Sequence, residues 1–215
     1  MLLRLPGVYP PQADTGMLAA LLASEHLDAE SRVLDLCTGT GVLGVRAAAL
    51  GAGCVTAVDI SRRALINTRL NAALGRRSLR IRRGDLTAPV RGERFALVMC
   101  NPPYVPAHDD ALPVRGAARA WDAGRNGRAL LDRVCVEAPE VLDRGGVLLI
   151  AQSALSGVTK TRIMLEERGM RVEIAARVEV PFGPVLSSRS SMFEKRGLIA
   201  SGQRSEELVV VRAVR

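Results

Sequence analysis

The apolar residues of this chain form short continuous runs, separated by longer segments with helical spacing. Runs of about four to eight apolar residues are typical of buried strands, whereas apolar residues three and four apart indicate a helix packed on one side. The runs predict strands at about 33–36, 54–58, 79–82, 95–100, 147–151, 171–180 and 207–212. Helical spacing and capping residues predict helices at about 14–27, 42–50, 61–74, 128–142 and 154–168.

This alternation of strands and helices predicts an α/β fold. We expect a Rossmann-like, doubly wound, mostly parallel seven-stranded sheet with an antiparallel last strand. The final two strands would form a hairpin-like pair, joined by a loose segment rich in proline, glycine and serine. The 215 residues fit one domain, so 1–215 is predicted to be a single domain.

Two segments lack periodicity. Residues 1–13 contain Pro6, Gly7 and Pro10 and are predicted to form an irregular arm, after which Asp14 or Thr15 would cap the first helix. The segment 103–123 is a long connection for a compact domain, and such connections are usually functional or mobile. We therefore predict a mobile substrate loop that acts as a lid near the end of the fourth strand.

Composition narrows the function classes. Aromatic residues make up 3% of the chain, which leaves little for nucleic-acid binding through rows of stacked rings. No run reaches the roughly 18 apolar residues of a membrane span, and the first residues are too few for a signal sequence, so a cytoplasmic protein is predicted. The 4 cysteines are widely spaced and there are 2 histidines. This pattern favours neither a disulfide framework nor a zinc site.

The chain has a formal net charge of +8 and a pI near 10.3. Nearly all of its cations are arginines, and the densest group is Arg76, Arg77, Arg80, Arg82 and Arg83. Such a group suits either a solvated edge of the fold or an electrostatic docking surface for nucleic acid. Both interpretations fit the sequence equally well.

The tetrapeptide Asn101-Pro102-Pro103-Tyr104 directly follows a predicted strand. Two successive prolines fix two φ angles and remove two donors, so the carbonyls beside them lie on a stiff loop without ladder partners. These carbonyls and the Asn101 side-chain oxygen are acceptors, and Tyr104 adds a flat ring. The loop could therefore hold a planar NH2 group, such as an amide or the exocyclic amine of a base. The alternative is a rigid turn that only ends the strand.

Acidic residues follow three predicted strands, at Asp35, Asp59 and Asp85. The carboxyl ends of parallel strands form the ligand-binding edge of an open sheet. Gly39 to Gly44 fit G-x-G-x-x-G, and Asp59 lies about twenty residues on, where a carboxylate accepts ribose hydroxyls. This pattern alone fits any nucleotide cofactor, nicotinamide included. Asp35, just before the glycines, favours a cationic ligand over a pyrophosphate. S-adenosylmethionine would place its amino-acid end at Asp35, its ribose at Asp59 and its adenine amine at Asp85.

These motifs resemble those of class I S-adenosylmethionine-dependent methyltransferases that methylate planar nitrogens. The resemblance rests on residues 35–41, Asp59, 84–86 and 101–104. Residues 8–15 and 120–128 are similar to the short branch of the HemK-like (release-factor glutamine methyltransferase) family, which lacks the N-terminal helical domain. That family modifies the glutamine of the Gly-Gly-Gln loop in translation termination factors. The resemblance therefore implies S-adenosylmethionine as cofactor, S-adenosylhomocysteine as product, no metal, and a release factor as protein substrate.

The resemblance also implies roles for single residues. Asn101, Pro102 and Tyr104 would form the catalytic loop, with Asn101 and Pro102 on the substrate amide. The implied cofactor contacts are Thr15, Asp35, Cys37, Gly39, Gly41, Asp59, Asp85, Leu86 and Asn101. Cys37 stands where the family usually has glycine, and Pro10 and Ala13 replace glutamates. A small activator subunit and a nucleic acid on the basic surface stay open as partners, and no membrane partner is implied.

Methyl transfer from a sulfonium requires alignment of nitrogen, methyl and sulfur more than a strong base. The tetrapeptide 101–104 contains no His, Cys or Glu nucleophile, which fits this reaction. The alternative activity is an adenine-N6 methyltransferase on DNA or RNA, whose substrate presents the same NH2 group. A nicotinamide-dependent oxidoreductase would leave Asp35 and the 101–104 loop unexplained, and a non-catalytic binding module would tolerate loss of Asn101.

Overall fold

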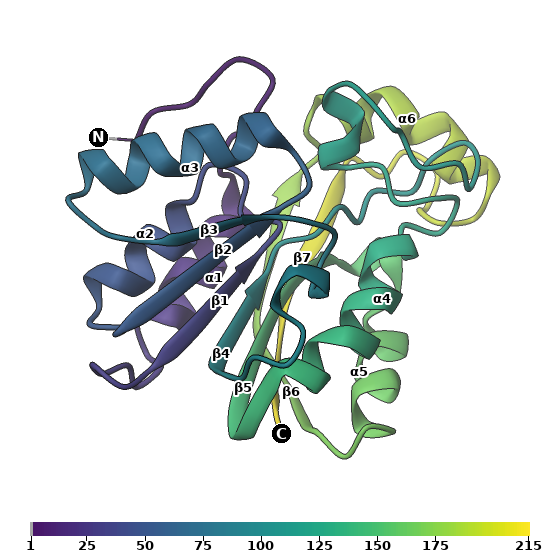
Figure 1. Ribbon diagram of the computed structural model, residues 1–215. Coiled ribbons are helices and arrows are strands. Elements are labelled where there is room, and N and C mark those ends of the chain that lie inside the picture. Colours follow the sequence, from purple (N-terminus) through teal and green to yellow (C-terminus); the bar gives the residue numbers. More distant parts are fainter. Residues whose placement is uncertain (1) are drawn as a thin grey trace.

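The predicted strands form one open sheet with helices on both faces (Figure 1). The structure, a computed structural model, describes residues 2–215. The strands are β1 Arg32–Leu36, β2 Cys54–Asp59, β3 Arg80–Arg83, β4 Phe95–Cys100, β5 Leu142–Ser153, β6 Arg171–Pro181 and β7 Ser205–Val214. Their order in the sheet is β3-β2-β1-β4-β5-β7-β6. Strand β7 runs antiparallel to β5 and β6, and the other neighbours are parallel. The predicted sheet, with its antiparallel last strand, is confirmed.

The helices are α1 Ala13–Leu22, α2 Val42–Ala49, α3 Arg62–Leu74, α4 Ala129–Glu137, α5 Val158–Glu166 and α6 Pro184–Lys195. Helices α1 to α3 pack on one face of the sheet and α4 and α5 on the other (Figure 1). Short 3-10 turns lie at Ala88–Val90, Ala117–Ala120, Ala138–Val141 and Ala154–Ser156. None of the helices within residues 2–215 is long and apolar enough to cross a bilayer.

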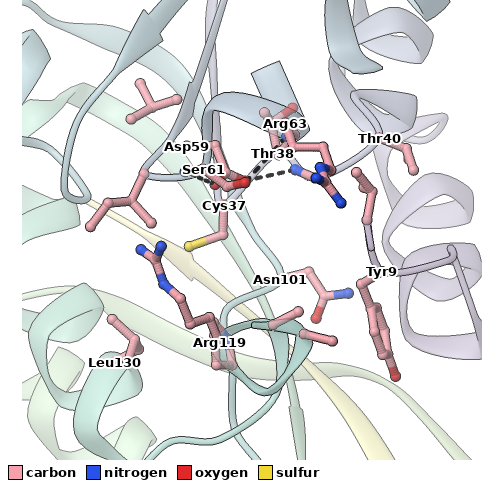
Figure 2. Close-up of a pocket in the computed structure, with 18 of the residues that line it drawn as sticks. Tyr9, Cys37, Thr38, Thr40, Asp59, Ser61, Arg63, Asn101, Arg119 and Leu130 are labelled. Atoms are coloured by element: carbon pink, nitrogen blue, oxygen red, sulfur yellow. Dashed lines mark hydrogen bonds between the residues drawn. The ribbon is translucent and has the colours of Figure 1, made fainter. Parts of the chain in front are cut away.

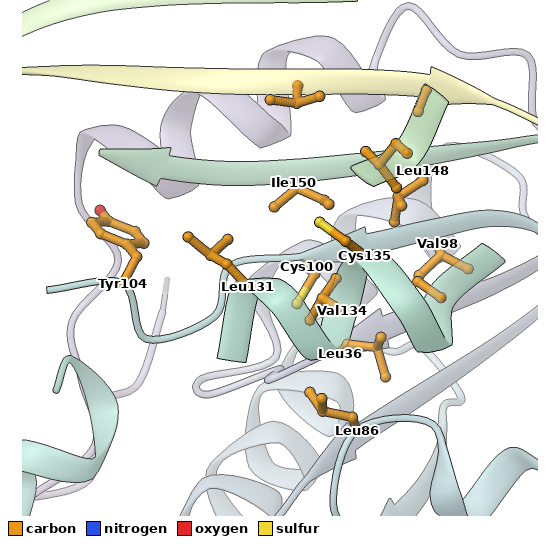
Figure 3. Packing of buried hydrophobic residues seen from close by; sticks show 14 of the residues in the cluster. Leu36, Leu86, Val98, Cys100, Tyr104, Leu131, Val134, Cys135, Leu148 and Ile150 are labelled. Atoms are coloured by element: carbon orange, nitrogen blue, oxygen red, sulfur yellow. The ribbon is translucent and has the colours of Figure 1, made fainter. Parts of the chain in front are cut away.

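Strands β1 and β4 are buried on both faces, so their side chains fill two cores in alternation. Leu36 and Val98 pack with α4 side chains such as Val134 (Figure 3). Leu97 and Met99 point to the opposite core, which α1 and α2 cover. This double burial explains why these strands read as continuous apolar runs rather than as an alternating pattern.

The register of the sheet aligns the ends of three strands. Leu36 on β1 pairs with Val58 on β2 and with Cys100 on β4. The residues that follow these three are Cys37, Asp59 and Asn101, so they emerge side by side at the same edge. Parallel pairing thus gathers three predicted site positions that are far apart in sequence.

The segment predicted to be a loose linker between the last two strands contains helix α6, so that prediction was wrong. Its composition of proline, glycine and serine resembles a loop, but Pro184 occupies the first turn of the helix, where a missing N–H costs nothing. Leu186, Ser190 and Phe193 form its buried face. A face with a serine in it gives a weak apolar pattern, which is why the helix escaped prediction.

Other helix boundaries also differ from prediction. Helix α1 ends at Leu22 rather than near residue 27, and its N-cap is Gln12, so Asp14 and Thr15 lie inside the first turn instead of capping it. The predicted helix 128–142 ends at Glu137, because Pro139 opens a 3-10 turn that leads directly into β5. These differences place Asp14 and Thr15 where their side chains are free for tertiary contacts.

The predicted substrate loop is held at both of its ends. Val105 N donates to Trp121 O (2.8 Å), and Ala123 N donates to Val105 O (3.1 Å). Arg189 of α6 and Arg196, the C-cap residue of that helix, fix the same region: Arg189 pairs with Asp122 (2.6 Å), and Arg196 donates to backbone carbonyls at 107 and 108. Residues 108–117 between these ends are mostly exposed. The lid therefore remains a prediction for this central part.

The N-terminal arm lies along α3. Leu3 N donates to Asn71 Oδ1 (2.8 Å), Leu5 N donates to Asn67 Oδ1 (2.7 Å), and both asparagine side chains donate to Leu3 O. These contacts explain why α3 buries two asparagines. They also fix the arm beside the carboxyl edge of the sheet. Met1, the first residue of the predicted arm, lies outside the described residues.

Candidate active site

A cavity of about 840 Å³ opens at the carboxyl edge of β1 to β4. This size is within the usual range for a site that holds a nucleoside-sized ligand. The ends of the strands form the floor of the cavity. The opposite side is lined by residues 7–11 of the arm and by the predicted loop at 112–120. Its lining includes Thr15, Asp35, Cys37, Gly39, Asp59, Asp85, Leu86 and Asn101 from the predicted set. Gly41, Pro102 and Tyr104 of that set are not part of the lining.

The glycine turn between β1 and α2 is built from internal contacts. Gly41 has φ 79°, and a side chain there would come within 2.6 Å of Thr68 Cγ2, so only glycine fits. Gly39 N donates to Asp59 Oδ2 (3.0 Å), and Gly41 N donates to Thr38 O (2.8 Å). These N–H groups are used within the protein. The turn therefore has two of its N–H groups occupied, and these two are not available to hold a pyrophosphate.

Asp35 is almost fully buried behind this turn. Its Oδ2 accepts hydrogen bonds from Thr38 Oγ1 (2.5 Å) and from Gly44 N (3.0 Å). Burial raises the pKa of Asp35 to about 7, against the opposing effect of these two hydrogen bonds. A positive charge in the cavity would favour its ionised form. The structure therefore gives Asp35 a structural role in the turn and leaves its predicted cofactor contact as a prediction.

Asp59 connects the end of β2 to the glycine turn. Its Oδ2 accepts from Gly39 N, and its Oδ1 accepts from Ser61 N (2.8 Å). Figure 2 shows the carboxylate beside the cavity, with both contacts drawn. Burial raises the pKa of Asp59 above its usual range, while these hydrogen bonds and the charge of Arg119 oppose the shift. Asp59 is thus fixed in position with its carboxylate at the cavity wall.

Asp85 and Leu86 border the other end of the cavity. Asp85 is exposed and pairs with Arg133 (3.0 Å from Nη1 to Oδ2), a residue that sequence reasoning did not select. Leu86 is buried and has φ 44°, a left-handed conformation that is uncommon for leucine. Leu86 lines the cavity in this conformation.

Cys37 also has a left-handed backbone, with φ 56°. This conformation favours glycine, which accounts for the glycine that the resembled family usually has at this position. Figure 2 shows the Cys37 sulfur pointing into the cavity. Burial, and then the neighbouring thiol of Cys37, raise the pKa of Cys100 well above its usual range. The thiol of Cys100 therefore lies beside that of Cys37 and keeps its proton.

The loop that begins at Asn101 presents only some of its predicted groups to the cavity. Asn101 and Pro103 line it, and Asn101 Nδ2 donates to Thr15 Oγ1 (3.3 Å). Tyr104 is buried, and its hydroxyl donates to Asp14 Oδ2 (2.8 Å). The ring of Tyr104 therefore anchors the loop to α1. The predicted role of a flat ring beside the substrate is instead open to Tyr9, which lies near Asn101 in Figure 2.

Two further side chains line the cavity, those of Tyr9 and Arg119. Tyr9 packs against Trp121, with ring centroids 6.0 Å apart, and so connects the arm to the predicted loop. Burial and the charge of Asp14 raise the pKa of Tyr9 to about 12, so its hydroxyl stays protonated. Arg119 points toward Cys37 and Asp59 (Figure 2). Nothing in the sequence distinguished Arg119 from the other arginines, because its role depends on how the loop folds back.

The cavity lining can bind and align a polar ligand, but it offers little for metal chemistry. Within residues 2–215, no group of three or more His, Cys, Asp or Glu side chains could hold a metal ion. The lining contributes fixed carboxylates on one side and a free amide oxygen of Asn101 on the other. This arrangement suits the binding of a cationic nucleoside next to a planar NH2 group.

A family model, the methyltransferase small domain, matches residues 1–117. The chain belongs to this methyltransferase family. It is 36% identical over 178 residues to a putative protein N5-glutamine methyltransferase of Methanocaldococcus jannaschii, covering 82% of this chain and 88% of that protein. The family membership confirms that the protein is a methyltransferase.

Longer bacterial relatives match over part of their length. A ribosomal protein uL3 glutamine methyltransferase of Bradyrhizobium diazoefficiens is 40% identical over 58% of this chain and 41% of its own length. A release factor glutamine methyltransferase of Deinococcus radiodurans is 36% identical over 65% of this chain and 52% of its own length. The methyltransferase thus spans about half the length of these two relatives.

The fold of the methyltransferase also matches a solved structure over nearly its whole length. That structure is the E. cuniculi Mtq2-Trm112 complex, described as responsible for the methylation of the translation termination factor eRF1. The TM-score is 0.66 at 23% identity, over 97% of this chain and 99% of that chain. The match supports the Rossmann-like methyltransferase fold.

Proposed function

We propose that this methyltransferase transfers a methyl group from S-adenosylmethionine to the side-chain amide nitrogen of a glutamine in a translation release factor. The observation that carries the proposal is the position of Asn101. It lines the cavity, and its amide nitrogen is bound to Thr15, which leaves its amide oxygen to accept from an incoming NH2 group. A glutamine amide presents such a group.

The residues of the cavity fit S-adenosylmethionine better than a dinucleotide. The N–H groups of Gly39 and Gly41 are already used, and Asp35 adds negative charge behind the turn where a pyrophosphate would lie. Asp59 would accept the ribose hydroxyls, and Asp85 with the backbone at Leu86 would border the adenine. When bound, this cofactor supplies a methyl group on a positively charged sulfur.

The residues of the chain need to align the substrate nitrogen rather than remove a proton with a strong base. Asn101 Oδ1, which lines the cavity, would accept one N–H of the substrate amide, and the carbonyl of Pro102, which lies in the chain between the lining residues Asn101 and Pro103, would accept the other. This pull favours the pyramidal nitrogen of the transition state over the planar ground state. The prolines keep the two acceptors in fixed geometry, which matters because a small misalignment costs rate steeply.

The names of the relatives support a glutamine amide as the substrate. The Methanocaldococcus relative is named for protein N5-glutamine and the Deinococcus relative for a release factor, whereas the Bradyrhizobium relative is named for ribosomal protein uL3. We favour the release factor because residues 120–128 resemble the release-factor branch. We also include a small activator subunit in the proposal, since the solved complex pairs its enzyme with a second protein.

The test is a parallel labelling assay with the full chain and S-adenosylmethionine labelled in its methyl group. The substrates are a release factor with its Gly-Gly-Gln loop, the same factor with that glutamine replaced by glutamate, ribosomal protein uL3, and adenine-containing DNA and RNA. Each is assayed with and without cell extract as a source of an activator. We expect label only in the intact release factor. Label in uL3 alone would mean that uL3, and not a release factor, is the substrate. Label in nucleic acid alone would overturn the proposal.

A further inference from the structure

A short chain of hydrogen bonds runs from α1 to the catalytic loop. Asn101 Nδ2 donates to Thr15 Oγ1 (3.3 Å), and Thr15 Oγ1 donates to Asp14 Oδ1 (3.3 Å). Thr15 N also donates to Asp14 Oδ1 (2.6 Å), and Tyr104 OH donates to Asp14 Oδ2 (2.8 Å). Both ends of the loop segment 101–104 are therefore attached, directly or through Thr15, to the same carboxylate.

The chemistry of these groups determines which group donates and which accepts in each hydrogen bond. An ionised carboxylate can only accept hydrogen bonds, and it is a stronger acceptor than a neutral amide oxygen. The single hydroxyl proton of Thr15 therefore goes to Asp14, and the oxygen of Thr15 can only accept on its other side. Asn101 must then present its NH2 to Thr15, because an amide oxygen facing Thr15 would find no donor there. The amide oxygen of Asn101 is left facing the cavity.

The surroundings keep Asp14 in this role. It is 3% exposed and lies in the first turn of α1, where the helix dipole stabilises a negative charge. Burial and the nearby charge of Asp14 raise the pKa of Tyr104 well above its usual range, so the phenol keeps its proton and remains a donor. The N-cap of α1 is Gln12 and has no side-chain cap, and Asp14 Oδ1 accepts from Thr15 N in the first turn of the same helix. Asp14 Oδ2 accepts from Tyr104 of the loop.

We propose that Thr15, held by Asp14, is a positioning residue that fixes the orientation of the Asn101 amide, so that its oxygen and not its NH2 meets the substrate nitrogen. This inference rests on the proposed function and adds to it. In a reversed Asn101 amide, the NH2 of Asn101 would face the NH2 of the substrate. Both groups are donors, so the hydrogen bond on which transfer depends would be lost. Thr15 lines the cavity with Asn101, yet its hydroxyl acts on the reaction through Asn101.

The first test compares Thr15→Val, which removes the hydroxyl and keeps the shape, with Thr15→Ser, which keeps the hydroxyl. We expect kcat to fall at least about 10-fold in Thr15→Val while the KM for S-adenosylmethionine changes less than about 3-fold. Thr15→Ser should stay within about 3-fold of wild type in both. A rise in the cofactor KM with kcat unchanged would show that Thr15 only binds the cofactor and would overturn the proposal.

A double-mutant cycle shows whether Thr15 acts through Asn101. In the Asn101→Ala background there is no amide to orient, so adding Thr15→Val should change the residual rate by less than about 2-fold. If the rate losses of the two single variants multiply in full in the double variant, Thr15 and Asn101 act independently, which would contradict the inference. Circular dichroism and thermal unfolding of each variant separate a loss of rate from a loss of fold.

A third measurement does not depend on activity. The side-chain amide signals of Asn101 in nuclear magnetic resonance spectra are assigned by their loss in Asn101→Ala. We expect a nuclear Overhauser effect between one Nδ2 proton and the methyl group of Thr15 in the wild-type protein. Its absence would overturn the inference even if glutamine is methylated. If no glutamine substrate is methylated but the effect is present, the proposed function fails and the orientation stands.

Discussion

The floor and the cover of the cavity are held in different ways. The floor consists of the residues at the ends of β1, β2 and β4, and its polar groups are bonded to one another, as Gly39 is to Asp59 and Gly44 to Asp35. The cover consists of arm residues 7–11 and loop residues 112–120, and much of the loop is exposed. The floor keeps a fixed geometry for chemistry, while the exposure of most of loop residues 112–117 fits the prediction that this part of the cover is mobile.

The largest expected effect comes from the floor, at Asn101. Asn101→Ala removes the acceptor for the substrate nitrogen, so the methyl-transfer rate should fall about 100-fold or more while the fold and cofactor affinity change little. Asn101→Asp keeps an acceptor but adds a negative charge that stabilises the sulfonium before transfer, so it should also be slow. Single-turnover assays with a Gly-Gly-Gln substrate measure both. If both variants transfer methyl at the wild-type rate, the loop 101–104 is only a rigid turn without a catalytic role.

A second comparison is between the half-buried carboxylate of Asp59 on the floor and the exposed carboxylate of Asp85 after β3. Asp59→Ala should weaken cofactor binding by about 1.5 to 3 kcal/mol, the scale of hydrogen bonds to a charged group. Asp85→Ala is the control at the exposed end, and we expect a smaller loss because water already solvates that carboxylate. Calorimetry with S-adenosylhomocysteine measures both affinities. Equal losses would mean that burial does not matter here, and tight binding of a nicotinamide dinucleotide would contradict the cofactor assignment.

The third prediction concerns the cover. Arg196 donates to the carbonyls of Ala107 (2.7 Å) and His108 (2.8 Å), where the exposed part of the loop begins. Arg196→Ala should increase the rate of proteolytic cleavage within 108–117 by roughly 10-fold, as expected for the loss of about one or two hydrogen bonds from a charged donor. Affinity for S-adenosylhomocysteine should change less than about 3-fold, because the floor is unaffected.

Arg196→Lys is the matched control for the cover. It keeps the charge but loses the planar fork that reaches two carbonyls, so its cleavage rate should lie between wild type and Arg196→Ala. Limited proteolysis followed by mass spectrometry locates the cuts. A cleavage rate that does not change in either variant would show that Arg196 does not hold the loop.

The same contrast explains which parts of the molecule the sequence could predict. The floor could be predicted because apolar runs mark where strands end. Parallel pairing then brings Asp59 and Asn101 together without further information. The glycine turn was accessible for a similar reason, since its residues are neighbours in the chain. Each of these features depends on local pattern plus one rule of topology.

The cover and the anchoring of the loop depend on contacts between distant residues. Arg196 reaches His108 across 88 positions, and Tyr104 reaches Asp14 across 90. No local pattern in the sequence predicts such pairs. Helix α6 was not predicted because its serines weaken the apolar pattern. The inward direction of Tyr104 could not be predicted for this reason, although its loop borders the cavity through Asn101 and Pro103.

The smallest expected effect is on the stability of the floor, at Cys37. Its φ of 56° is a left-handed conformation that costs a residue with a side chain about 1 kcal/mol or more. Glycine adopts this conformation freely but loses more entropy on folding, by about 0.5 to 1 kcal/mol. The two effects nearly offset each other, so Cys37→Gly should raise the free energy of unfolding by less than about 1 kcal/mol in urea titrations. Cys37→Ser keeps the strained backbone and should bring no gain. An equal gain in both variants would trace the effect to the thiol beside Cys100 rather than to the backbone, and a clear loss in Cys37→Gly would show that packing of the thiol outweighs the strain.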